Sequence, residues 1–167
     1  MLWYSARAAP IFSAKKFVDR LGLNREGCYA IPGLIDIHFH GCMGHDFCDG
    51  TEEAIKEIAK YEASVGVTAI NPATMTLPVE ELEEILATGA AYGKKQQAQP
   101  DPARADFLGV NMEGPFISEE KKGAQDARNI RLCDVEIFHR FQKAAEGTVN
   151  YIGVAPEKEA PWSLWRQ

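Results

Sequence analysis

The sequence predicts an α/β fold in which parallel strands alternate with helices. Two observations lead to this prediction. Strand-like segments recur four times at intervals of roughly 35–40 residues, and the segments between them have the apolar spacing of amphipathic helices. Such alternation is typical of βαβ units with right-handed crossovers. Either a doubly wound open sheet or part of a (β/α)₈ barrel satisfies the pattern.

Length and composition are those of an ordinary globular domain. The chain has 167 residues, of which 46% are hydrophobic, and this suffices for one domain with a buried core. The net charge of -6, without a basic face, argues against a nucleic-acid-binding protein. No apolar run approaches membrane-spanning length, and residues 1–5 do not resemble the start of a signal peptide. We therefore expect a cytoplasmic protein with no membrane partner and with free thiols rather than disulfides.

The elements are expected in a definite order. Residues 1–27 show no sustained period, so we expect turns there and a short helix near residues 14–21. Thr51 can cap the first clear helix and Gly66 can end it. The other expected elements are strands at 33–40, 67–70, 107–112 and 149–155, a helix starting near Pro78, a loop from Lys94 to Arg104, and a helix from Asp134 to Gly147.

The first strand contains the first candidate site. Its residues alternate with a period of two, which gives the strand an apolar face and a polar face. The apolar face is expected to pack against helices and consists of Ile35, Ile37 and Phe39. The polar face presents Asp36, His38 and His40, and neutral imidazole is the commonest metal ligand. The pattern predicts a metal site at His38 and His40; alternatively, both are polar residues on the solvated face of an edge strand.

The third strand is expected to bring a carboxylate to the edge of the sheet at which His38 and His40 lie. Apolar and polar residues alternate along it, and Glu113 leaves its end on the polar face. Because the carboxyl ends of parallel strands share one edge, Glu113 could complete a His/His/Glu metal set with His38 and His40. The following Gly114-Pro115 favours this interpretation, since proline restricts the backbone beside the carboxylate. Alternatively, Glu113 is a solvated loop acid or a helix-capping partner.

A basic loop follows the third strand. The segment Lys121-Lys122-Gly123-Ala124-Gln125 puts two cations and a glycine near the same edge. Such a loop can hold an anionic or polyhydroxylated ligand through backbone N–H groups and the Gln125 side chain. It is equally consistent with a basic surface turn.

Five segments of the chain share motifs with a known family. They are residues 27–41, Gly66-Val67-Thr68, Pro72-Ala73-Thr74, residues 111–117 and Lys122-Gly123-Ala124-Gln125. Together they resemble the N-acetylglucosamine-6-phosphate deacetylases of the amidohydrolase superfamily. The Pro-Gly-x-Ile-Asp-x-His-x-His pattern alone indicates only the superfamily, whereas its combination with Glu-Gly-Pro-Phe and Lys-Gly-Ala-Gln is specific for these deacetylases.

The resemblance implies a fold, a cofactor and a set of site residues. Residues 27–167 would be the N-terminal half of an amidohydrolase (β/α)₈ TIM barrel, with about four βα units. Residues 1–26 would be an irregular remnant of an N-terminal β region. The metal would be zinc or iron, one or two ions per site, and its ligands would be His38, His40 and Glu113. Ala124, through its backbone, and Gln125 would lie along the bound sugar.

The resemblance also implies an activity. It is the metal-dependent hydrolysis of the acetamide of N-acetyl-D-glucosamine 6-phosphate to glucosamine 6-phosphate and acetate, a reaction of amino sugar metabolism. The complete enzyme would be a homo-oligomer, and its partner a small-molecule amino-sugar phosphate. The family's general-base Asp and two further metal-binding histidines follow the fourth strand, and we assign no residue of this chain to these roles.

We therefore expect a chain that is incomplete for catalysis, either a truncated reading frame or one half of a split chain. One alternative is a non-catalytic fragment or pseudogene product that retains part of a metal site. Another is an independent open-sheet domain that binds a ligand without metal.

Overall fold

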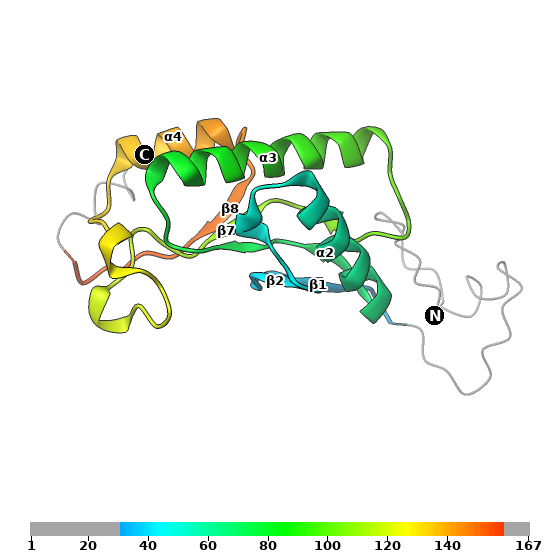
Figure 1. The fold of residues 1–167 in the computed structure, drawn as a ribbon, viewed down its shortest axis with the longest axis horizontal. Coiled ribbons are helices and arrows are strands. Elements are labelled where there is room, and N and C mark those ends of the chain that lie inside the picture. Colours follow the sequence, from blue (N-terminus) through cyan, green and yellow to red (C-terminus); the bar gives the residue numbers. More distant parts are fainter. Residues whose placement is uncertain (1–30, 159–167) are drawn as a thin grey trace, which may run out of the picture.

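A computed structural model describes residues 31–158 of the chain (Figure 1). The expected turns and short helix in residues 1–27, and the proposed β remnant in residues 1–26, lie outside this range. In chain order the elements are β1 (Leu34–Asp36), β2 (Gly41–Cys42), β3 (His45–Asp46), the 3₁₀ helix η1 (Phe47–Asp49), α2 (Glu52–Val65), β4 (Val67–Ile70), β5 (Ala73–Thr74), α3 (Val79–Ala98), β6 (Asp106–Phe107), β7 (Val110–Met112), the 3₁₀ helices η2 (Glu119–Lys121) and η3 (Ala127–Asn129), α4 (Val135–Ala144) and β8 (Val149–Ile152).

The spatial order of the strands follows the chain. β4 lies between β1 and β6, β7 lies between β5 and β8, and each of these pairings is parallel. A doubly wound sheet reverses its strand order at a switch point, whereas a (β/α)₈ barrel keeps it. The described residues therefore form an α/β fold with parallel sheets in barrel order, and these sheets do not close into a barrel.

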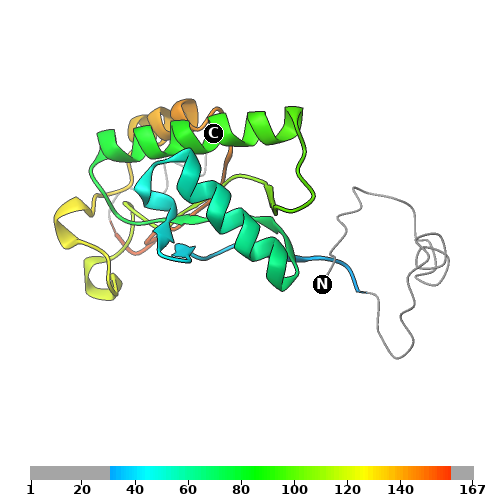
Figure 2. The same ribbon diagram turned by 45° about the vertical axis from the view of Figure 1, so that its right-hand side comes forward.

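The helices lie on one side of the strands (Figures 1 and 2). α3 and α4 run side by side, and α2 packs beside β4. As predicted, the Thr51 hydroxyl caps α2 by accepting the Ala54 N–H at 3.2 Å, and Gly66 ends the helix in a left-handed conformation with φ 99°. None of the helices within residues 31–158 has the length and apolarity needed to cross a membrane.

The core fills the space between helices and strands. The apolar stripes predicted for the three helices are buried or half-buried, as are the strand residues that face them. Its largest fully buried apolar side chains are Phe47, Phe116, Phe141, Ile55, Ile58, Ile70, Leu82, Leu86, Met112 and Val110. The strands β4 to β8 each contribute buried residues to the fold, whereas β1 contributes none.

The first strand is shorter than predicted. It ends at Asp36 rather than at residue 40, and the glycine-containing segment after it forms the β2–β3 hairpin. Asp36 Oδ1 accepts the His38 N–H at 3.0 Å, so a side chain takes a backbone donor that a longer ladder would use. The two histidines consequently lie beyond the end of the strand.

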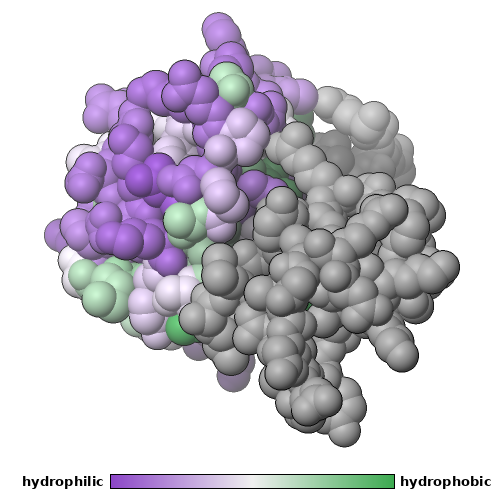
Figure 3. All heavy atoms as spheres, turned by 90° about the vertical axis from the view of Figure 1, so that its right-hand side faces the viewer, coloured by the Kyte–Doolittle hydropathy of each residue, from purple (hydrophilic) through white to green (hydrophobic). Residues whose placement is uncertain are grey.

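The apolar face predicted for this strand is also wrong in part. Ile35 and Ile37 are 58% and 48% exposed, whereas Phe39 packs against the small cluster around Ile58 and Ile70. Among the described residues, β1 pairs with β4 only, and none of the helices in this part of the chain covers its other side. On the face shown in Figure 3 the described residues are mainly hydrophilic, with apolar residues in small separate areas.

Three further boundaries differ from prediction. α3 continues to Ala98, because residues 94–98 are good helix formers and the first proline comes at Pro100. The third strand divides into β6 and β7 around Gly109, whose φ is 151° and where a Cβ would lie 2.3 Å from the Thr148 carbonyl oxygen. The fourth strand ends at Ile152 rather than at residue 155.

Candidate metal centre

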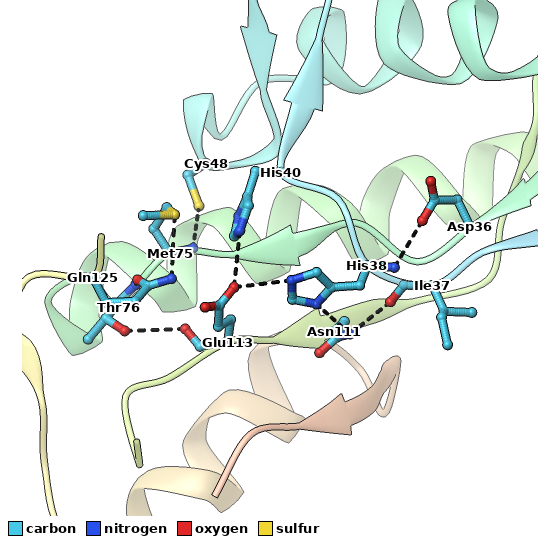
Figure 4. Close-up of polar contacts among 10 residues, drawn as sticks. All are labelled: Asp36, Ile37, His38, His40, Cys48, Met75, Thr76, Asn111, Glu113 and Gln125. Carbon is cyan, nitrogen blue, oxygen red and sulfur yellow. Dashed lines mark hydrogen bonds and ion pairs between the residues drawn. The ribbon is translucent and has the colours of Figure 1, made fainter. Parts of the chain in front are cut away.

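His38, His40 and Glu113 lie together at the carboxyl ends of the first and third strands (Figure 4). His40 Nε2 is 3.0 Å from Glu113 Oε2, and His38 Nε2 is 3.3 Å from the same oxygen. One ligand atom from each residue lies within 4.8 Å of the other two. The structure thus brings together the three residues that the sequence predicts as metal ligands.

The spacing and chemistry of these atoms fit a small divalent metal. Tetrahedral ligands at about 2.0–2.1 Å from zinc are about 3.3 Å from one another, which is close to the two observed nitrogen–oxygen distances. Imidazole nitrogen with carboxylate oxygen suits zinc or iron better than calcium or magnesium, which prefer oxygen alone. Three protein ligands leave a coordination position for water or substrate.

Asn111 orients His38. Its Nδ2 donates to the Ile37 carbonyl at 2.7 Å and lies 3.2 Å from His38 Nδ1. An amide group that contacts both the Ile37 carbonyl and the His38 ring fixes the orientation of this ring, with Nε2 facing Glu113. Sequence reasoning did not assign Asn111 a role, although its place two residues before Glu113, on the polar face of the strand, is a usable signal.

The backbone at Glu113 is held by Thr76. The Thr76 hydroxyl donates to the Glu113 carbonyl oxygen at 3.2 Å. Gly114 follows with φ 94°, and a Cβ at this position would lie 2.1 Å from Thr76 Oγ1. Only glycine accommodates both this conformation and this contact, so Thr76 and Gly114 together set the direction of the Glu113 side chain.

Gly114→Ala is expected to destabilise the chain by more than about 2 kcal/mol, because it adds backbone strain and a clash with Thr76. Gly123→Ala is the matched control, since Gly123 also has a positive φ (61°) but no described atom within 4 Å of a Cβ. Its cost should be about 1 kcal/mol, from the backbone alone. Urea unfolding of both variants measures the difference, and equal losses would contradict the role of the Thr76 contact.

The residues predicted to lie along a sugar are on the loop between η2 and η3. Ala124 is exposed, whereas Gln125 is 2% exposed. Gln125 Oε1 accepts the Thr76 N–H at 2.6 Å, and its Nε2 donates to Met75 Sδ at 3.6 Å (Figure 4). The Gln125 side chain thus ties this loop to the backbone that supports Glu113, and contact of Ala124 or Gln125 with a sugar stays a prediction.

His40 is less completely supported than His38. Within residues 31–158 its Nδ1 atom is buried without a hydrogen-bond partner. A metal-bound imidazole normally donates the proton of its second nitrogen to a carboxylate, a carbonyl or water. The described part of the site therefore supplies three ligand atoms but not every outer contact that such a site uses.

Cys48 lies beside the cluster, but its sulfur is not among the grouped ligand atoms (Figure 4). Its Sγ accepts the Met75 N–H at 3.1 Å, and burial raises the pKa of the thiol to about 12. Because the thiolate is the nucleophilic form, a thiol with so high a pKa is a poor nucleophile at neutral pH.

Fold and site together define a class of protein. Parallel βα units in barrel order, with a His-x-His pair after the first strand and a glutamate after the third, form the arrangement expected of an amidohydrolase.

Comparison with known proteins shows which amidohydrolases the chain is similar to. No protein-family model matches the chain. The N-acetylglucosamine-6-phosphate deacetylase of Bacillus subtilis (strain 168) is 31% identical over 136 residues, which make up 81% of this chain and 34% of that protein. The same enzyme of Vibrio furnissii is 34% identical over 128 residues, 77% of this chain and 31% of that protein.

A solved structure agrees with these relatives. It is a mutant N-acetyl-D-glucosamine-6-phosphate deacetylase from Mycobacterium smegmatis in complex with N-acetyl-D-glucosamine-6-phosphate. It matches with a TM-score of 0.71 and 25% identity over 80% of this chain and 33% of that chain. The chain is a partial homologue of the N-acetylglucosamine-6-phosphate deacetylases, and it spans about a third of the length of the curated relatives it matches.

Proposed function

We propose that this chain is the metal-binding portion of an N-acetylglucosamine-6-phosphate deacetylase and that its strands are part of a (β/α)₈ barrel. The observation that supports this most directly is the convergence of His38, His40 and Glu113, from two separate strands, on one point. The metal would be zinc or iron. The substrate would be N-acetyl-D-glucosamine 6-phosphate, the compound bound in the homologous structure.

Each residue has a defined part in this proposal. His38 and His40 bind the metal through Nε2, and Glu113 supplies the negative charge that balances it. Asn111 sets the ring orientation of His38, and Thr76 sets the backbone of Glu113. A divalent metal so held would polarise the acetamide carbonyl and lower the pKa of a bound water.

The proposal assigns no general base to this chain. Turnover needs a group that takes the proton of the attacking water. We infer that this group lies among the two thirds of the relatives' length that the chain does not span. The metal-binding step and the hydrolytic step are therefore separable by experiment.

Metal binding is tested by titrating the whole metal-free chain with cobalt(II) and recording its absorption. We expect one equivalent to bind with the visible bands of a nitrogen and oxygen site and without a sulfur-to-cobalt charge-transfer band. Ligand at 100 times its dissociation constant should also stabilise the fold by about 2.7 kcal/mol. No binding, or a thiolate spectrum, would contradict the proposed site.

The same metal-loaded protein is then assayed for acetate release from N-acetyl-D-glucosamine 6-phosphate. Folded, metal-bound protein without turnover is the expected result, and it supports a chain that holds metal but lacks the base. Metal-dependent turnover would instead show that the chain, alone or as an oligomer, contains a base that we have not identified.

A further inference from the structure

The two residues that follow β5 are held by side chains rather than by a neighbouring strand. β5 ends at Thr74. Beyond it, Cys48 Sγ accepts the Met75 N–H at 3.1 Å, and Gln125 Oε1 accepts the Thr76 N–H at 2.6 Å (Figure 4). Since a strand ladder supplies neither bond, the position of this short segment depends on those side chains.

Thr76 has all of its polar groups engaged. Besides the N–H bond to Gln125, its carbonyl oxygen accepts the Asn129 side-chain amide at 3.3 Å, and its hydroxyl donates to the Glu113 carbonyl at 3.2 Å. Gln125 and Asn129 both belong to the η2–η3 loop, residues 118–129. Thr76 therefore links this loop to the backbone of a proposed metal ligand.

Gln125 is fixed on both sides of this link. Its side chain is 2% exposed, and the Nε2 atom donates to Met75 Sδ at 3.6 Å. On the loop, its backbone N–H donates to the Lys122 carbonyl at 3.1 Å, and its carbonyl accepts Lys122 Nζ at 2.8 Å. Because a buried amide without hydrogen bonds is costly, we expect Gln125 and Thr76 to stay together or to separate with a clear loss of stability.

The other end of the η2–η3 loop is held less firmly. Glu120 pairs with Lys158 at 2.6 Å and accepts the Ser118 hydroxyl at 2.7 Å. The two charged side chains are 66% and 34% exposed, and exposed ion pairs contribute little to stability. The buried contacts at Thr76 are therefore expected to decide how well the loop is ordered.

We propose that Gln125 is a positioning residue of the metal site: by holding Thr76 it holds the backbone of Glu113, so the order of the η2–η3 loop sets the affinity for metal. This inference rests on the metal site proposed above. It gives the buried Gln125 side chain a role through Thr76, distinct from the sugar contact that the sequence predicts. Because such coupling is reciprocal, bound metal should in turn stabilise the loop.

The first test compares two glutamines by cobalt(II) titration of the whole chain. Gln125→Met keeps the length of the side chain but removes both amide bonds. We expect about tenfold weaker cobalt binding, the lower end of the range for changes outside a ligand set.

Gln96→Met is the matched control. The Gln96 amide also makes two bonds, from Nε2 to the Ala105 carbonyl at 2.8 Å and from the Phe107 N–H to Oε1 at 2.7 Å. None of these residues belongs to the metal cluster. Both variants should unfold more easily, and only Gln125→Met should bind cobalt more weakly. Equal losses of affinity would reflect general stability and overturn the proposal.

The second test asks whether Gln125 acts through the Thr76 hydroxyl. Thr76→Val removes this hydroxyl with little change of shape, and it should weaken cobalt binding at least as much as Gln125→Met does. The double variant should bind cobalt no more weakly than Thr76→Val alone, because the link is already cut. If the two losses multiply instead, Gln125 acts by another route and the proposal is wrong.

The third test measures the reciprocal effect by hydrogen exchange with and without zinc. Within the loop, the Gln125 and Asn129 N–H groups donate to the Lys122 and Asp126 carbonyls, each at 3.1 Å. In the parent chain we expect zinc to slow the exchange of these amides, and Thr76→Val should remove most of this protection. Exchange in the loop that does not respond to zinc would overturn the proposal.

These tests separate the inference from the function on which it rests. A parent chain that bound no metal would contradict the proposed function, and this inference with it. A parent chain that bound metal, together with a Gln125→Met variant of parental affinity, would leave the metal site standing and refute the role of Gln125 alone.

Discussion

Glu113→Gln is expected to lower the affinity of the chain for a divalent metal by at least about 100-fold, since even changes outside the ligand set cost 10- to 100-fold. The carboxylate oxygen lies within 3.0–3.3 Å of both imidazoles and is the sole anion among the three clustered ligand atoms of the described residues. Glutamine has nearly the same shape but no charge. The loss of metal affinity therefore measures the contribution of the Glu113 carboxylate as a ligand rather than a change in the fold.

The measurement is competition for cobalt(II) or zinc against a coloured chelator. Glu119→Gln is the matched control, because it removes the same charge from an exposed side chain on η2. The control should bind metal as the parent chain does. If Glu113→Gln also bound metal with parental affinity, the ion would occupy another site and the ligand assignment would be wrong.

Metal-free Glu113→Gln should unfold close to the parent chain. Thr76 holds the backbone carbonyl of Glu113 rather than its side chain, and this contact survives the substitution. The side chain is 32% exposed, so the exchange leaves no deeply buried charge uncompensated. Thermal unfolding without metal therefore separates a loss of binding from a loss of fold.

Local signals in the sequence were sufficient for the starts of α2 and α4. Thr51 and Asp134 start α2 and α4 as capping residues, because each side-chain oxygen accepts a backbone N–H of the first turn. The strand β4 was also predicted with its observed bounds, since glycine precedes it and Asn71-Pro72 follows it. These features depend on residues near one another in the chain.

The ends of the other strands depend on contacts that no local pattern reveals. β1 stops early because the Asp36 side chain takes the His38 N–H. Ile35 and Ile37 are exposed because no helix within residues 31–158 covers that side of the sheet, which periodicity alone does not show. An alternating pattern predicts two faces, and what packs against each face is decided by the tertiary structure.

The candidate site was likewise predicted in part, in its ligands but not in the contacts that support them. Spacing within the His-x-His pair and the shared edge of parallel strands indicated that His38, His40 and Glu113 could meet, and the family resemblance implied that they bind a metal. The supporting contacts were not predicted, because Asn111 and Ile37 are 74 positions apart and Thr76 and Glu113 are 37 apart.

Phe141→Ala is expected to destabilise the chain by about 3–5 kcal/mol, the range for truncating a buried phenylalanine. Phe141 is fully buried, and its ring lies 6.5 Å from that of Phe116. It is also the buried residue through which α4 joins the core. For a domain whose stability is about 5–15 kcal/mol, such a loss is a large part of the total.

Phe138→Ala is the comparison, because Phe138 lies on the same helix at a half-buried position against the core. It should cost clearly less than Phe141→Ala in urea unfolding followed by circular dichroism. Neither phenylalanine belongs to the metal cluster, so the folded fraction of each variant should keep the parental metal affinity. Equal losses at the two positions would mean that α4 is anchored elsewhere, whereas a selective loss at Phe141 shows that this ring fixes α4 over the sheet that supports Glu113.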